Sequence, residues 1–244
     1  MLKIWNAANF RRTLAALCLI GAPLFFSASE LLAPPGVEGN DIPAMLANLA
    51  RYHDRQMQAT MLEIAAAILF IPVFFGLMHL LSERGVVWGH IGGGIALLGD
   101  ALILVMNGAN LALWAITAPG VDLSAMLTPM NVFGSSPVVG VMFMAYYLFS
   151  IGFLLLGIGL WRSRTVPTWA PVCLMLAVLM DYVIGSFLGD SMIISVITDA
   201  LLIVGLSGVA WHLLTIGDAG WTAMTAKVST AQTSAPQVHA TETL

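Results

Sequence analysis

Charged residues are scarce in this chain. Only 9% of its 244 residues are charged, whereas 59% are hydrophobic, and the formal net charge is −4. No basic stripe of the kind that binds nucleic acid is present, and no run of basic residues marks a contact with anionic lipid. The composition therefore predicts neither of these partners and points to a chain that lies largely in a membrane.

Cysteine is also scarce, and motifs for cofactors are missing. The two cysteines, Cys18 and Cys173, have no CxxC or Cys/His spacing of a zinc site. No phosphate-cradling glycine loop, metalloprotease helix or nucleotide fingerprint occurs in the sequence. We therefore predict no cofactor, and we expect both thiols to be small buried side chains that form no disulfide.

Long apolar runs are abundant. Six of them approach the ~20 residues that a helix needs to cross a bilayer. They are Thr13–Ala33, Ala59–Ser82, Val87–Thr117, Val138–Trp161, Thr168–Leu188 and Met192–Leu214. The sequence therefore predicts an all-α transmembrane helical bundle of six spans within one membrane domain, residues 1–216. Residues 217–244 are rich in Ala, Thr, Ser and Gln, a composition that predicts a largely disordered cytoplasmic tail.

The basic residues predict the orientation of the bundle. If the amino terminus is cytoplasmic, the inner segments hold seven of the nine basic residues, and the outer segments hold only Arg51 and Arg55. Basic residues accumulate in the short cytoplasmic segments of membrane proteins. We therefore expect both termini to be cytoplasmic and the protein to reside in the cytoplasmic membrane of a bacterium.

The beginning of the chain also resembles a secretory signal. Lys3 and the pair Arg11-Arg12 precede an apolar run, and Ser27-Ala28-Ser29 resembles a cleavage site. Cleavage there would remove residues 1–29 and leave five spans. The apolar run continues to Ala33, however, and therefore suits a membrane span better than the core of a signal peptide.

The two longer outer segments differ in their helix signals. Asp41 precedes Pro43 as a helix cap, and the apolar residues that follow recur at three- and four-residue steps. We predict an outer amphipathic helix at about 42–57, which either lies in the headgroup plane or covers the outer mouth of the bundle. In the second outer segment, Ala118–Pro137, we predict a loop with apolar side chains that fold back onto the bundle, namely Leu127, Met130 and Phe133.

One part of the chain carries a family resemblance. The block Ile42–Gly85 continues from the amphipathic helix into IAAAILFIPVFFGLMHLLSERG, and the next span begins with the glycine-rich sequence HIGGGIALLGD. This part resembles a group of uncharacterised bacterial multi-pass membrane proteins whose second span ends in a similar basic turn. The resemblance implies a multi-pass architecture but no activity, cofactor or site residue.

Five acidic residues lie within the predicted spans. They are Glu30, Glu63, Asp100, Asp181 and Asp199, and no Lys or Arg lies in a span to pair with them. A central aspartate that faces lipid costs about 2.5–3.5 kcal/mol, so these side chains are expected to face the interior of the bundle. In the predicted orientation, all of them except Asp100 fall in the outer half. This distribution predicts an acidic cavity that opens outward.

Two interpretations of the polar residues in the spans remain open. Asp100 and Asn107 are seven residues apart and share one helix face. Together with Asp181 and Asp199, they can form a proton- or cation-linked site. Alternatively, these groups are protonated acids that form hydrogen bonds between helices and hold the bundle in register.

Two other patterns suggest chemistry. His79, His90 and His212 all lie near predicted cytoplasmic ends of spans, where imidazoles can ligate a metal ion or haem, although histidine is also an ordinary interfacial residue. The sequence Gly205-Leu206-Ser207-Gly208 resembles the GxSG motif of rhomboid intramembrane proteases. His212 follows Ser207 by five residues, about 140° around the same helix, so we expect Ser207 to be a packing residue.

Three functions are consistent with these patterns. The leading one is a non-enzymatic membrane protein whose buried acidic residues either stabilise the bundle or serve small-solute or proton-linked transport through the acidic cavity. The second is a non-catalytic scaffold or accessory protein that binds a membrane protein or a second copy of this chain. The third is an intramembrane haem or metal protein that uses the three histidines. No catalytic residue is predicted, and the lipid bilayer is the one partner that the composition requires.

Overall fold

The computed structural model describes residues 7–35, 41–181 and 192–216, and these residues form eight helices and no strand. The helices are α1 (Ala7–Leu32), α2 (Ile42–Arg51), α3 (His53–Leu80), α4 (Val86–Ile116), α5 (Leu123–Gly134), α6 (Pro137–Ser163), α7 (Trp169–Leu179) and α9 (Met192–Thr215). The predicted all-helical class is therefore confirmed. The predicted tail, 217–244, lies outside the described residues.

Five of these helices are long and apolar enough to cross a membrane, namely α1, α3, α4, α6 and α9. Each of them overlaps one predicted span, because a long apolar run specifies a helix through local sequence alone. The predicted fifth span, Thr168–Leu188, coincides with α7 up to Leu179. Its last residues, 182–188, lie outside the described residues, so this span is represented by a shorter apolar helix of 11 residues.

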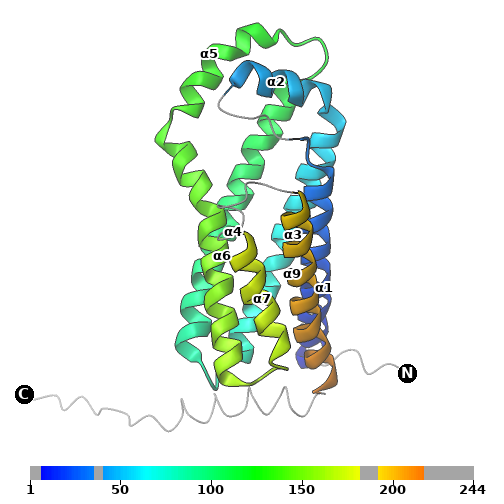
Figure 1. Ribbon diagram of the computed structural model, residues 1–244, viewed down its shortest axis with the longest axis vertical. Coiled ribbons are helices and arrows are strands. Elements are labelled where there is room, and N and C mark those ends of the chain that lie inside the picture. Colours follow the sequence, from blue (N-terminus) through cyan, green and yellow to red (C-terminus); the bar gives the residue numbers. More distant parts are fainter. Residues whose placement is uncertain (1–6, 36–40, 182–191, 217–244) are drawn as a thin grey trace, which may run out of the picture.

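The five long helices and the shorter α7 form a closed ring. Around the ring, each helix packs mainly against two others, in the order α1, α3, α4, α6, α7, α9, and α9 closes the ring against α1. Figure 1 shows that the start of α1 and the end of α9 lie at the same end of the bundle, while α2 and α5 lie at the opposite end. We call the end with α2 and α5 the outer end.

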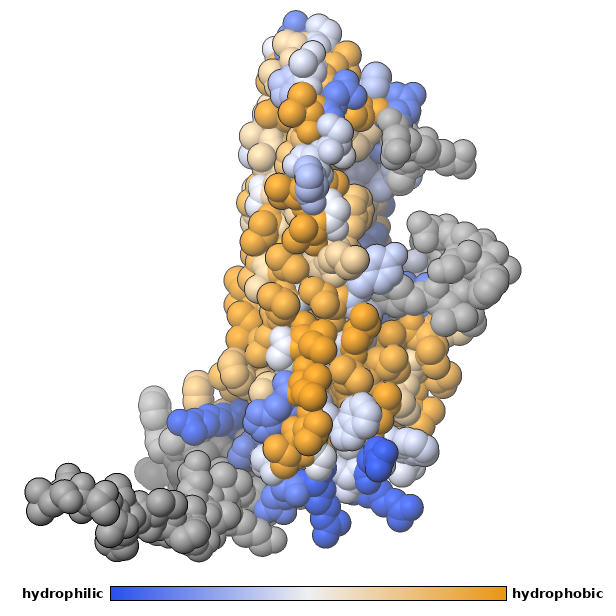
Figure 2. Space-filling model, turned by 90° about the vertical axis from the view of Figure 1, so that its left-hand side faces the viewer, coloured by the Kyte–Doolittle hydropathy of each residue, from blue (hydrophilic) through white to orange (hydrophobic). Residues whose placement is uncertain are grey.

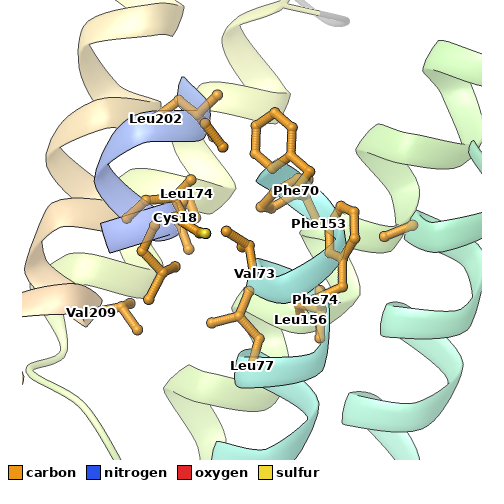
Figure 3. Packing of buried hydrophobic residues seen from close by; sticks show 14 of the residues in the cluster. Cys18, Phe70, Val73, Phe74, Leu77, Phe153, Leu156, Leu174, Leu202 and Val209 are labelled. Carbon is orange, nitrogen blue, oxygen red and sulfur yellow. The ribbon is translucent and has the colours of Figure 1, made fainter. Parts of the chain in front are cut away.

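A cluster of four phenylalanines fills the middle of the ring. Phe70 and Phe74 of α3 face Phe149 and Phe153 of α6, with ring centroids 5.1 Å apart for Phe70–Phe149 and 5.3 Å for Phe74–Phe153. The rings meet edge to face, the geometry that aromatic pairs prefer. Figure 3 shows Phe70, Phe74 and Phe153 among the buried apolar side chains. Packing of these rings joins two helices that are not neighbours around the ring.

Small residues let α4 and α6 approach closely. A Cβ atom added to Gly99 would overlap with the backbone of Phe149, and one added to Gly152 would overlap with the backbone of Ala96. On α9, a Cβ at Gly205 would press on Leu174, and one at Gly208 would overlap with the Trp169 ring. The glycines around Ser207 therefore serve packing against α7, as expected for a structural rather than a catalytic motif.

The outward surface of the ring is apolar. Phe75, Val105 and Phe143 are 59%, 60% and 62% exposed, and they belong to three different helices. Figure 2 shows a broad hydrophobic surface along α4 and α6, with hydrophilic residues at both ends of the molecule. Monomeric water-soluble proteins rarely expose apolar patches of more than a few hundred Å². This surface is compatible with a multi-pass membrane protein.

The outer end differs from the predictions in two places. Asp41 caps α2 by accepting a hydrogen bond from the backbone of Ala44 at 3.1 Å, as predicted, but α2 ends at Arg51 and α3 begins after a break at Tyr52. The periodic apolar pattern predicted one continuous helix and gave no indication of this break. The segment predicted as a loop contains the helix α5, which packs against α2 and buries Met130, whereas Phe133 is 38% exposed.

Arg55 ties the outer end of α1 to α3. Its guanidinium donates hydrogen bonds to the carbonyl oxygens of Leu32 and Leu31 at 2.6 and 2.8 Å. The last carbonyls of a helix have no partner within the helix, and a cation there also interacts favourably with the helix dipole. Asn48 of α2 donates a further bond to the carbonyl of Pro35 at 2.7 Å. These contacts hold the end of α1, where Glu30 lies, against the outer helices.

Candidate functional site

Two adjoining cavities lie in the outer half of the bundle. The larger, of about 220 Å³, is lined by residues of α1, α3, α4 and α6. The smaller, of about 140 Å³, is lined by residues of α1, α6, α7 and α9, together with Asp181 just beyond α7. Phe26, Glu30 and Tyr146 line both cavities. These three residues therefore form the boundary between the two spaces.

Four acidic side chains converge on these cavities from four parts of the chain. Glu30 and Glu63 line the larger cavity, and Glu30, Asp181 and Asp199 line the smaller one. Neither set of described lining residues contains a Lys or an Arg. Glu30 lies within electrostatic reach of the other three acids. The ring therefore concentrates negative charge, or the protons that neutralise it, in one region.

The acids differ in their access to the surroundings. Glu30 and Asp181 are exposed, Glu63 is half-buried, and Asp199 is 8% exposed. Ser27 of α1 lies beside Asp199, and Ser195 and Thr198 of α9 line the same cavity. The acids thus form a series from accessible to buried positions.

Tyr146 anchors one of the acids. Its hydroxyl donates a hydrogen bond of 2.7 Å to Oε1 of Glu63, which joins α6 to α3 across the larger cavity. A hydroxyl that donates to a carboxylate forms a stronger bond than one that donates to a neutral acceptor. The contact therefore holds the Glu63 carboxyl in a fixed position between α3 and α6.

Asn107 lies beside Glu63 on the side of α4. It is fully buried, and its Nδ2 donates to the carbonyl of Ile103 at 3.1 Å. Asn107 also lies close enough to the Glu63 carboxyl to interact with it, while its Oδ1 has no hydrogen-bond partner among the described residues. The Asn107 side chain therefore gives the Glu63 carboxyl a polar neighbour on α4, in addition to Tyr146 on α6.

Asp100 is placed apart from the other acids. It is 1% exposed at the middle of α4 and lines neither cavity. Its Oδ1 has no hydrogen-bond partner within the described part of the chain. The structure therefore places Glu30, Glu63, Asp181 and Asp199 around the cavities, with Asn107 beside Glu63, and leaves Asp100 buried on its own.

Several polar residues of the cavities were absent from the predicted set. They are Ser29, Gln56, Thr60, Asn110, Tyr146, Ser150, Ser195 and Thr198. Most of them are small or amide side chains on apolar helices, and they carry no charge that would single them out. Tyr146 contacts a residue 83 positions away in sequence. Its role depends on the order of helices around the ring, which the sequence pattern does not specify.

The three histidines do not assemble into a metal site. His90 is exposed, and its Nδ1 lies 2.9 Å from the carbonyl oxygen of Val86 in the preceding turn. His79 and His212 are half-buried on α3 and α9. Across residues 7–35, 41–181 and 192–216, no group of three His, Cys, Asp or Glu side chains is arranged to hold a metal ion. Cys18 and Cys173 are both free thiols; Cys18 is buried as predicted, whereas Cys173 is only half-buried.

Comparisons with known proteins add no relative. The chain matches no family model, no curated protein and no solved structure. The resemblance of Ile42–Gly85 to multi-pass membrane proteins stays a prediction, and the function is argued from the site alone.

Proposed function

We propose that this chain is a six-span protein of the bacterial cytoplasmic membrane with both termini in the cytoplasm. Five apolar helices of sufficient length support the membrane placement. The arginines support the orientation, because Arg84, Arg162 and Arg164 lie on the turns at the end where α1 starts, and Arg51 and Arg55 lie at the outer end.

We propose further that the acidic cavities take up protons or small cations from the outer side and serve their transport. The observation that carries this proposal is the convergence of four carboxyl groups on two adjoining cavities, which none of the described basic residues lines. Carboxylates that are partly removed from water require a proton or a cation to offset their charge. An anion would meet only repulsion at this position.

The size of the cavities limits the solute. Sites for drug-sized ligands have volumes of about 300–1,000 Å³, whereas these cavities measure about 220 and 140 Å³. They suit protons, metal cations or solutes of a few atoms. The mixture of hydroxyl, amide and carboxyl groups also supplies the oxygen ligands that hard cations prefer.

The contacts of Glu63 suggest how occupancy is linked to protonation. The Tyr146 hydroxyl donates a hydrogen bond to Glu63, and the Asn107 side chain lies beside the same carboxyl. These two polar partners hold the carboxyl at the edge of the larger cavity, where a cation that enters the cavity favours its charged form. Such a group changes state when a cation enters or leaves the cavity beside it.

Reconstitution in liposomes tests this proposal. A pH gradient is imposed, and proton uptake is followed with a trapped pH-sensitive dye in the presence of Na⁺, K⁺ or ammonium. We expect uptake that depends on the protein and that falls at least tenfold in Glu63→Gln and Asp199→Asn. Asp54→Asn is the matched control, because Asp54 is exposed in the first turn of α3 and lines neither cavity.

The same variants separate transport from a purely structural role. If the acids only hold the helices in register, Glu63→Gln and Asp199→Asn lower the melting temperature in detergent, and the wild-type protein gives no uptake above empty liposomes. That result would reject the transport proposal. It would favour the scaffold, for which a membrane partner that co-purifies and is lost when α2 is deleted would be the positive evidence.

A further inference from the structure

We propose that the cytoplasmic end of the ring contains a binding site for the phosphate group of an anionic phospholipid, built by Arg84, Arg162 and Arg164. The turn between α3 and α4 and the end of α6 enclose a hollow of about 490 Å³ there. A second hollow, of about 400 Å³, adjoins it and shares Arg162 and Arg164. This proposal rests on the membrane placement proposed above and not on the acidic cavities.

The fold brings together arginines that are far apart in the sequence, and they form a basic pocket. Arg84 is separated from Arg162 and Arg164 by α4, α5 and most of α6, so no polybasic run occurs. Packing of α4 against α6 brings the two segments together at one hollow. Glu83 precedes Arg84, and the described lining residues of the two hollows include no carboxylate. Three guanidinium groups against the one neighbouring carboxylate of Glu83 leave the local charge positive.

Backbone groups reinforce this charge. α4 begins at Val86, and its capping residue Gly85 provides no side-chain hydrogen bond to the first turn. Val86, Val87 and Trp88 line the larger hollow. Their amide groups are among the first four of a helix, which have no partner within it and favour anions. The amide groups add to the guanidinium groups, which match a phosphate group with two parallel hydrogen bonds.

The backbone at Arg164 indicates that its side chain has a role of its own. Arg164 ends α6 with φ of 52°, in the left-handed region where glycine is the least strained residue. An arginine there costs conformational energy that a glycine would avoid. Its guanidinium compensates in part through the negative end of the α6 dipole. A phosphate group in the adjoining hollow would be a second source of compensation.

The surroundings favour a lipid over a free phosphate. Val87 is 64% exposed and Trp161 is 52% exposed, and they flank the arginines on α4 and α6. Apolar and tryptophan side chains at the end of a span suit the boundary between headgroups and acyl chains. Basic pockets between spans on the cytoplasmic side are known to suit acidic lipid headgroups. A soluble phosphate would gain nothing from these apolar neighbours.

Native mass spectrometry of the delipidated protein in detergent tests the assignment. The probes are dioleoyl phosphatidylglycerol, dioleoyl phosphatidylcholine and soluble glycerol phosphate. We expect preferential retention of phosphatidylglycerol, with affinity about fivefold lower for each arginine removed in Arg84→Gln, Arg162→Gln and Arg164→Gly. Arg51→Gln is the control, because it removes an exposed arginine at the opposite end of the ring.

Arg164→Gly distinguishes a binding role from a structural one. Glycine removes the conformational strain of the left-handed backbone at this position. We therefore expect an unchanged or higher melting temperature together with weaker retention of phosphatidylglycerol. Equal retention of the two lipids by the wild-type protein, or an equal loss in Arg51→Gln, would overturn the proposal. Glycerol phosphate that binds as tightly as phosphatidylglycerol would overturn the lipid assignment. Protein that stays in solution without detergent would instead overturn the membrane placement.

Discussion

Tyr146 of α6 donates a hydrogen bond of 2.7 Å to Glu63 of α3, although the two residues are 83 positions apart in the chain. The bond crosses the larger cavity between helices that are not neighbours around the ring. The same two helices also contact each other in the middle of the ring, through the phenylalanine cluster. This cluster consists of Phe70, Phe74, Phe149 and Phe153. The outer cavity thus lies above an apolar centre, with one polar contact that spans it.

Tyr146→Phe tests the charge of Glu63. A hydrogen bond to a neutral group contributes about 0.5–1.5 kcal/mol to stability, and one to a charged group about 1.5–3 kcal/mol. We therefore expect a small loss of unfolding free energy at low pH, where Glu63 is protonated, and a larger loss at high pH, where it is charged. Denaturant titration in detergent at several pH values measures this difference. An equal loss at every pH would show that the strength of this bond does not depend on the charge of Glu63.

Gly99→Ala tests the close approach of α4 and α6. The added methyl group overlaps with the backbone of Phe149, which cannot rotate away as a flexible side chain could. We expect a loss of at least about 1–3 kcal/mol, the usual cost of overpacking. Gly108→Ala is the control on the same helix, because nothing lies within 4 Å of its added Cβ. It is expected to stabilise the helix by up to about 1 kcal/mol, as measured by thermal unfolding in detergent.

Arg55→Gln tests the outer attachment of α1. The substitution removes a cation that donates to the carbonyls of Leu31 and Leu32, and bonds of a charged group contribute about 1.5–3 kcal/mol. The last turn of α1 should then open more often, so we expect hydrogen exchange of the amides at 29–33 to become at least about tenfold faster. Arg51→Gln removes the same charge without this contact and should leave exchange unchanged. Similar exchange in both variants would show that Arg55 does not hold the helix end.

The local sequence predicted where most helices lie, whereas the contacts between helices depend on packing and were not predicted. The span predicted as Val87–Thr117 is observed as Val86–Ile116, because apolar length alone specifies a helix in lipid. The helix α5 was missed, since its 12 residues contain Pro129 and carry no charged face to mark a period. The site was predicted in part for a similar reason. A buried acid is visible in a sequence, but its partner on another helix is not, as Tyr146 and Glu63 illustrate.

Phe70→Ala tests the phenylalanine cluster at the centre of the ring. Phe70 is 1% exposed and packs on Phe149 and Phe153, so its removal leaves a void that the surrounding helices cannot fill. We expect a loss of about 3–5 kcal/mol in unfolding free energy. Phe75→Ala removes the same side chain from a position that is 59% exposed on the same helix, and it should change stability by less than about 1 kcal/mol. The double variant Phe70→Ala with Phe153→Ala should lose less than the sum of the single losses, because the two rings share a contact. Equal effects of Phe70→Ala and Phe75→Ala would mean that this cluster does not fill the middle of the ring. Apolar packing would then not close the inner side of the outer cavities.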